Sequence, residues 1–283
     1  MTDTAVTLAI GFVSGVLSGM FGIGGGVVTT PALRLILGAP ALIAVGTPLP
    51  VIIPSAITGA ISYTRRGLAD VRTGVTVGLV GSGFAVAGAL LATRAGGRVV
   101  LMATAVLIVY MAADMLLQTI RPPATAKAAP VAPAAAPVGP AASDPTDGSI
   151  VAEAAPPERG ANIWGLALLG AVTGLYSGFL GLGGGFVLVP MLTRWFGFPV
   201  KRAIGTSLVA VGLLAIPGTI SHYLLGNVDV HAALLLIVGV VPGALVGARI
   251  TFGASDRAIR LGFAALLLVV GVTLAASELG WLG

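Results

Sequence analysis

Apolar stretches about as long as the hydrocarbon core of a bilayer is thick recur along this sequence and limit what it can fold into. A transmembrane helix needs about 20 consecutive apolar residues, and such stretches include Gly74–Thr93, Val99–Ile120, Ala203–Leu225 and Leu261–Ser277. Of the 283 residues, 57% are hydrophobic and 9% are charged, whereas soluble domains carry about 25% charged residues. The alternating segments of a transmembrane β-barrel do not occur. The sequence therefore predicts an all-α polytopic integral membrane protein.

The charged and metal-binding residue types exclude several other classes of function. The net charge is +5, but the 15 Lys and Arg lie at the ends of apolar runs without forming a basic stripe, so no nucleic-acid partner is predicted. No cysteine is present, and the two histidines, His222 and His231, belong to no cluster with metal-ligand spacing. No metal, cofactor or catalytic residue is predicted. The N-terminus lacks a basic n-region, so we expect the first apolar helix to remain as a span.

One segment in the middle of the chain differs from everything around it. Residues 121–160 are rich in Pro and Ala, lack apolar periodicity and cannot bury enough surface to offset their ordering entropy. We expect them to form a disordered cytoplasmic linker. The linker divides the chain into a first transmembrane repeat, 1–120, and a second transmembrane repeat, 161–283.

The two halves are copies of each other, because adding 159 to a residue number in the first half gives its counterpart in the second. Between the blocks 15–31 and 174–190, nine of seventeen positions are identical, and both blocks contain a run of three glycines. In each half an apolar helix (4–21, then 163–180) leads into the glycines, and a short apolar piece (26–37, then 185–196) follows. Three full-length spans complete each half, near 40–62, 72–93 and 98–119 and near 199–224, 230–251 and 257–278. One register for so many positions indicates an internal duplication.

The distribution of basic residues predicts that the second half is inverted relative to the first. Basic residues gather on the cytoplasmic side of a membrane protein. If each short piece carries the chain back across the bilayer, one face collects twelve of the fifteen basic residues and the other keeps Arg34, Arg94 and Arg98. If the short piece re-enters and returns, the split is six to nine, which is no bias. We therefore expect inverted repeats, each with a Gly-rich broken helix pair and three full transmembrane helices.

The glycine runs are the strongest candidates for a binding site. A helix is broken at membrane depth only where protein or a water-filled cavity surrounds the break. Consecutive glycines leave backbone amides accessible, and the half-helix that follows adds the positive end of its dipole. Broken helices at matching positions of two inverted halves indicate the substrate site of a transporter. The predicted cradle consists of Gly24, Gly25 and Gly26 with Gly183, Gly184 and Gly185. By contrast, Gly15 and Gly19 and their copies fit close helix packing.

Further candidates lie outside the glycine runs. Thr47 and Pro48, with their copies Thr206 and Ser207, form a second candidate site in the spans. The hydroxyl groups of Thr47, Thr206 and Ser207 can bind a ligand or bond back to their own helix. Arg65 and Arg66 could capture anions at the inner mouth, although topology also explains them. Asp114 is the one carboxylate well inside a hydrophobic span and is a candidate for proton coupling.

His222 is the only plausible base near a hydroxyl, because Ser221 precedes it. An intramembrane enzyme would need such a pair. We expect instead a solvated histidine at an outer helix end.

The repeated motif resembles the TauE/SafE family. Two copies of an SG-x-x-G-x-GGG-x-x-x-x-P block, Ser18–Pro31 and Ser177–Pro190, are each followed by an x-A-x-GT-[PS] element. The resemblance covers nearly all of both halves and leaves out only the linker. Members are grouped with the sulfite exporters and described as transporters of sulfite, sulfoacetate and related small organic anions. The resemblance implies movement of anions out of the cytoplasm, although uptake members are described.

The predicted function is a secondary transporter of small anions such as sulfite, sulfoacetate or related organosulfonates. Export would proceed by alternating access at a midplane site between the repeats, in the inner (plasma) membrane. An uptake permease for a small organic anion is the main alternative, followed by an intramembrane enzyme or a scaffold. The expected partners are the small anionic substrate and the lipid bilayer. A homodimer is possible.

Overall fold

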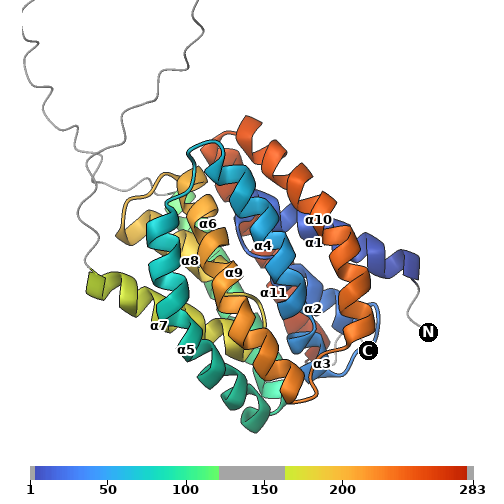
Figure 1. Ribbon diagram of the computed structural model, residues 1–283. Coiled ribbons are helices and arrows are strands. Elements are labelled where there is room, and N and C mark those ends of the chain that lie inside the picture. The colour runs from blue at the N-terminus through green and yellow to red at the C-terminus, as the bar shows by residue number, and fades with distance from the viewer. Residues whose placement is uncertain (1–3, 121–162, 279–283) are drawn as a thin grey trace, which may run out of the picture.

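The computed structural model describes residues 4–120 and 163–278, and this part of the chain is helical without a β-strand (Figure 1). Its helices are α1 (Thr4–Phe21), α2 (Gly26–Leu35), α3 (Ala41–Gly46), α4 (Pro48–Thr64), α5 (Val71–Ala95), α6 (Gly97–Ile120), α7 (Ile163–Leu180), α8 (Gly185–Trp195), α9 (Val200–Leu224), α10 (Val230–Gly253) and α11 (Asp256–Glu278). The linker predicted for 121–160 lies outside the described residues.

Eight helical segments of the described chain are long and apolar enough to cross a membrane. They are α1, the segment Ala41–Thr64, α5, α6, α7, α9, α10 and α11. The all-α membrane fold predicted from the apolar stretches is confirmed. The short helices predicted after the glycines are also present: α2 has 10 residues and α8 has 11. At 1.5 Å per residue each is roughly 15–17 Å long, about half the thickness of a hydrocarbon core.

The two halves differ at one helix. The first full span of the first half is divided into α3 and α4, whereas its copy α9 is continuous. Pro48 begins α4 and has no backbone N–H to donate to the preceding turn. Its copy Ser207 has one, so α9 continues through this position.

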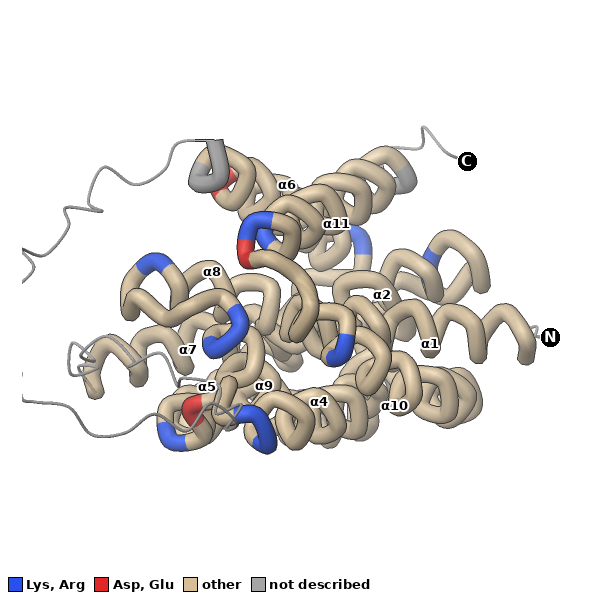
Figure 2. The backbone as a smooth tube through the Cα atoms, turned by 90° about the horizontal axis from the view of Figure 1, so that it is seen from above, with Lys and Arg blue, Asp and Glu red and all other residues tan. Residues whose placement is uncertain are grey.

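The helices form three layers (Figure 2). Helices α5, α9, α4 and α10 lie side by side in one outer layer, and α6 and α11 pack together on the opposite side. The broken pairs α1–α2 and α7–α8 lie between these layers, so the glycine runs are in the interior of the molecule.

The halves are interlocked rather than separate. Helix α1 packs along α10 of the other half, and its copy α7 packs along α5 of the first half. Glycines allow this close approach, because a Cβ at Gly15 would lie 2.9 Å from the Cα of Val240. In the copy, a Cβ at Gly174 would lie 2.7 Å from the Cα of Gly81. The packing role predicted for Gly15, Gly19, Gly174 and Gly178 is confirmed.

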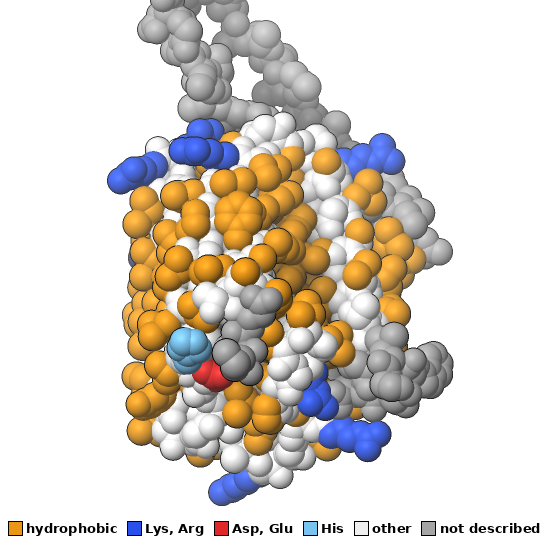
Figure 3. Space-filling view, turned by 90° about the vertical axis from the view of Figure 1, so that its right-hand side faces the viewer, with side chains coloured by type: hydrophobic (Ala, Val, Ile, Leu, Met, Phe, Trp, Pro, Cys, Tyr) orange, Lys and Arg blue, Asp and Glu red, His pale blue; other side chains and the backbone are white. Residues whose placement is uncertain are grey.

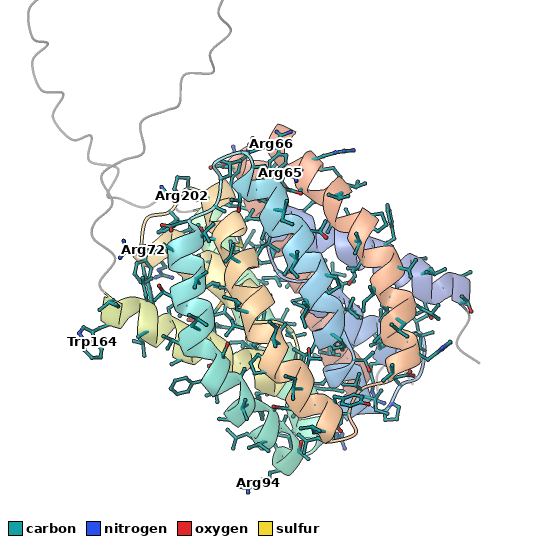
Figure 4. The ribbon with its side chains drawn as sticks, in the orientation of Figure 1. Arg65, Arg66, Arg72, Arg94, Trp164 and Arg202 are labelled. Atoms are coloured by element: carbon teal, nitrogen blue, oxygen red, sulfur yellow. The ribbon has the colours of Figure 1, made fainter. Side chains whose placement is uncertain are left out.

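Charged side chains are confined to the two ends of the molecule on the face shown in Figure 3, apart from one acidic group, and hydrophobic side chains cover the band between. Figure 4 places Arg65, Arg66, Arg72 and Arg202 at one end and Arg94 at the other. Arg65 directly follows α4, whereas Arg202 lies in the first turn of its copy α9. Helix α4 therefore ends at the end of the molecule where α9 begins, so these two copies run in opposite directions.

Candidate functional site

Each glycine run is a sharp turn that only glycine can form without strain. Three residues of the first break have positive φ: Gly22 at 72°, Gly24 at 76° and Gly25 at 87°. The second break repeats this geometry at Gly181, Gly183 and Gly184, with φ of 68°, 79° and 69°. Residues with a Cβ rarely adopt this conformation. The spacing of the glycines is thus fixed by the backbone of the two turns.

The two breaks contact each other in the interior. A Cβ at Gly26 would lie 2.9 Å from the backbone of Leu182, and one at Gly185 would lie 2.8 Å from the Cα of Ile23. Leu182 and Ile23 are copies of each other, and both are completely buried. Two segments that are far apart in the chain and copies of each other therefore meet at one place, as a common site requires.

One pair of side chains packs against both breaks. A Cβ at Gly24 would lie 2.8 Å from Ile52 and 2.8 Å from Val211, and one at Gly183 would lie 2.8 Å from Ile52 and 3.2 Å from Val211. Ile52 and Val211 are copies, on α4 and α9. The same two side chains thus lie between the glycine turns of both halves. Sequence reasoning missed both residues, although the constant offset that relates them was visible.

The turns leave a set of backbone amides without acceptors. Within the described chain, no hydrogen-bond acceptor is found for the backbone N–H groups of residues 23–26 or 182–185. These residues are buried, and buried amides are normally paired. They precede or begin α2 and α8, so the positive ends of two helix dipoles add to the same region. The arrangement provides hydrogen-bond donors and partial positive charge without a cationic side chain.

Buried hydroxyl groups surround the first break and are mostly paired. Ser14 donates to the carbonyl of Gly25 at 2.8 Å and also bonds to Thr29. Ser18, one turn before the break, bonds to Ser55 on α4. These contacts fasten the turn to the helices on either side of it.

Two other buried hydroxyl groups beside the breaks have no hydrogen-bond partner in the described chain. Ser177 is the copy of Ser18, but Leu214 stands where Ser55 would be, and the Ser177 hydroxyl has no partner among the described residues. The Cβ of Ser177 lies 3.5 Å from the position of a Cβ placed on Gly184. The hydroxyl of Thr30, one turn after Gly26, is likewise buried and without a partner in the described chain. Both residues were missed at the sequence level, because nothing in the pattern distinguishes a paired hydroxyl from an unpaired one.

The hydroxyls that the sequence singled out have structural partners. The Oγ1 of Thr47 accepts a hydrogen bond of 3.0 Å from the amide of Asp229, and the Oγ1 of Thr206 accepts one of 2.9 Å from the amide of Asp70. Each threonine therefore connects its helix to the loop that begins a helix of the other half.

Ser207 contacts a break directly. Its hydroxyl donates to the carbonyl of Gly22 at 2.9 Å. Pro48 occupies the corresponding position in the other half, one turn after Val45, whose backbone lies against Gly181. The GT-[PS] elements thus pack beside the glycine turn of the opposite half.

Arg65 and Arg66 do not join the breaks. Both lie at the end of the molecule (Figure 4) and are exposed. The guanidinium of Arg66 stacks over the ring of Phe252, 4.0 Å from its centroid. A role at the mouth remains a prediction.

Asp114 forms an ion pair rather than standing alone in a span. Its Oδ1 lies 2.8 Å from Nη1 of Arg194, the basic residue in the last turn of α8. The Arg194 side chain is 57% exposed and that of Asp114 is 25% exposed. The pair lies near the last turns of α6 and α8, away from the glycine turns.

The expectation of a solvated His222 was wrong. His222 is completely buried, and its Nε2 lies 2.9 Å from the carbonyl of Gly178. Its copy Tyr63 is also completely buried and donates to the carbonyl of Gly19 at 2.9 Å. The reason is that α1 and α7 pass over these helix ends, which a local reading of the chain did not reveal. Both side chains hold the last turn before a break.

The described residues contain no group of three or more His, Asp or Glu that could hold a metal ion. Eight apolar segments long enough to span a membrane, with two broken helices meeting in the interior, define a multi-pass helical membrane protein.

A family model described as "Sulfite exporter TauE/SafE" matches residues 7–274, and the chain belongs to this family. The resemblance inferred from the repeated motif is confirmed.

Relatives match along almost their whole length. The chain is 25% identical over 280 residues to "Probable membrane transporter protein YunE" of Bacillus subtilis, covering 95% of this chain and 96% of that protein. It is 27% identical to a probable membrane transporter protein of Methanocaldococcus jannaschii, covering 94% and 92% of the two chains. It is 28% identical to one of Xylella fastidiosa, covering 94% and 93%. No solved structure matches the chain.

Proposed function

We propose that the protein is a secondary transporter that exports small oxyanions such as sulfite, sulfoacetate or related organosulfonates. The observation that carries this proposal is the meeting of the two glycine breaks in the interior, where Gly26 lies against Leu182 and Gly185 lies against Ile23. Membership of a family described as sulfite exporters supports the substrate class and the direction.

The chemistry of the breaks favours an anion. The amides of residues 23–26 and 182–185 have no acceptor in the described chain, and the first turns of α2 and α8 add partial positive charge. An oxyanion can accept from several such donors at once, and the hydroxyls of Ser177 and Thr30 offer two more. Gly24, Gly25, Gly26, Gly183, Gly184 and Gly185 form the proposed cradle, with Ser207 beside it. Thr47, Pro48 and Thr206 position the cradle through the contacts described above.

An inverted arrangement of the repeats suits alternating access. Two inverted repeats, 1–120 and 161–283, would expose one midplane site first to one side and then to the other. Ile52 of α4 and Val211 of α9 pack against both breaks. Movement of α4 relative to α9 would therefore change how accessible both glycine turns are to a substrate. The basic end with Arg65 and Arg66 would be cytoplasmic. Because His222 already bonds a backbone carbonyl, we propose no enzymatic role.

Flux into proteoliposomes tests the proposal with a matched pair of variants. Gly184→Ala and Gly197→Ala both place a Cβ at a positive φ, 69° and 70°, so their backbone strain is similar. A Cβ at Gly197 meets nothing within 4 Å, whereas one at Gly184 meets the carbonyl of Thr173 at 2.8 Å. We expect the wild-type protein and Gly197→Ala to transport labelled sulfite or sulfoacetate, and Gly184→Ala to lose most of this flux. Flux no faster than through empty vesicles for every small anion tried would refute the transporter.

A further inference from the structure

A groove between α6 and α7 is lined mainly by apolar side chains of these two candidate membrane spans, and several of them are exposed. It has a volume of about 770 Å³, and its lining includes Arg98, Met102, Val106 and Tyr110 of α6 with Tyr176 and Phe179 of α7. The side chains from α6 recur every three or four residues, so they form one face of that helix. All but Arg98 are apolar or aromatic. Several are strongly exposed, including Val106 at 68% and Tyr110 at 61%.

The groove has a cationic end and the length of one bilayer leaflet. Arg98 is exposed in the first turn of α6, directly after the turn that ends α5. Arg94, in the last turn of α5, lies at the end of the molecule (Figure 4). From Arg98 to Tyr110 the helix rises roughly 18 Å. One leaflet contributes about 15 Å of hydrocarbon. The Arg98 guanidinium thus lies at the level of the lipid phosphate groups, and the apolar part of the groove is about as long as the acyl chain of one leaflet.

The corresponding place in the other half is filled by the protein itself. Between α1 and α11, Phe21 stacks on Phe263 with ring centroids 5.3 Å apart. Their copies in the other half are Leu180 and Thr104, whose side chains are smaller and cannot form such a stack. The duplication thus kept a basic residue at both places, Arg98 and Arg257, whereas the aromatic stack is formed between α1 and α11 and has no counterpart beside Arg98. This difference argues for an occupant of the α6–α7 groove rather than for general lipid contact.

We propose that the α6–α7 groove binds one glycerophospholipid of the bilayer, with an acyl chain along Val99–Tyr110 and its phosphate at Arg98. The aromatic rings of Tyr176 and Phe179 provide the opposite wall from α7. A bound lipid there would support α7, the helix that leads into the second glycine break. The site is independent of the anion cradle and would exist whatever the transported substrate is.

Native mass spectrometry of the purified full chain, titrated with phosphatidylglycerol, tests the site with two matched pairs. Arg98→Gln removes the cation of the groove, and Arg257→Gln removes its copy beside the aromatic stack. We expect Arg98→Gln to weaken the tightest lipid adduct about fivefold and Arg257→Gln to leave it unchanged. Val106→Trp fills the groove, whereas Ala265→Trp adds the same side chain at the exposed copy position on α11. We expect only Val106→Trp to abolish the tight adduct.

Four outcomes would overturn the proposal. Equal losses in Arg98→Gln and Arg257→Gln would indicate general attraction of lipid to basic residues. A tight adduct that survives in Val106→Trp would place the lipid elsewhere. Dissociation of a dimer in Val106→Trp would make the groove an interface between two copies of the chain. Displacement of the lipid by inorganic phosphate alone would assign an anion site without an acyl chain. Thermal unfolding of each variant identifies any that fails to fold, and the second matched pair then decides.

Discussion

Replacing Ser177 by Ala should make the protein more stable and a poorer transporter at the same time. Its hydroxyl is completely buried and has no partner among the described residues, because Leu214 stands where the first half has Ser55. The copy, Ser18, bonds to Ser55. The two serines therefore provide a matched comparison within one molecule, in which the same substitution has opposite expected effects on stability.

The magnitudes follow from the hydrogen bonds. A buried hydroxyl without a partner costs about 1–3 kcal/mol, so Ser177→Ala should raise the free energy of unfolding by about 1 kcal/mol. Ser18→Ala loses a hydrogen bond and leaves Ser55 unpaired, so it should lower the free energy of unfolding by about 1–3 kcal/mol. If the Ser177 hydroxyl donates to the bound anion, its loss costs about 1.5–3 kcal/mol of binding. The apparent KM for sulfite should then rise at least about tenfold.

Two measurements on each variant check this reasoning. Thermal unfolding in detergent gives the change in stability, and concentration-dependent sulfite flux in proteoliposomes gives KM. A lower unfolding temperature for Ser177→Ala together with an unchanged KM would refute the argument, because the hydroxyl would then contribute to packing and not to the substrate.

Three further predictions concern side chains that contact the backbone or a charged partner rather than the proposed substrate. Tyr63→Phe should lower the free energy of unfolding by about 1–3 kcal/mol in thermal unfolding, because the carbonyl of Gly19 loses its donor; unchanged stability would contradict this. Thr206→Val keeps the side-chain shape but leaves the amide of Asp70 without its acceptor, so a similar loss is expected, together with faster amide exchange at the start of α5. Asp114→Asn breaks an exposed ion pair and should change stability by less than about 1 kcal/mol, with the pH dependence of flux retained; loss of that dependence would instead make Asp114 the coupling residue.

Much of the fold was predictable because the duplication repeats in the sequence. Helices of the two halves begin at corresponding positions, as α1 and α7 or α5 and α10 do, and the same constant offset relates the glycine runs. Apolar length predicted the spans, and the short pieces after the glycines were predicted as half-length helices. These features depend on local pattern, which one sequence contains.

The contacts between the halves could not be predicted in this way. Nothing in the order of helices shows that α1 packs on α10 and α7 on α5. For that reason His222 was expected in solvent, although it lies beneath α7 with its Nε2 at the Gly178 carbonyl. The roles of Thr47 and Thr206 depend on the same exchange, since each hydroxyl bonds a loop of the other half. A clue was available, because Tyr63 is the copy of His222 and both can donate a hydrogen bond.

The exchange of helices between the halves also affects how the protein is made. Gly15 of α1 packs against Val240 of α10. Most of the chain between these two residues must be synthesised before α10 is available to α1. At typical translation speeds this delay is roughly 10–50 s, during which α1 must remain in the membrane without the neighbour it needs. A first half produced alone should therefore be degraded, whereas two halves expressed as separate polypeptides in the same cell should rescue each other. The first half of this protein therefore reaches its final packing only after α10 of the second half has been inserted into the membrane.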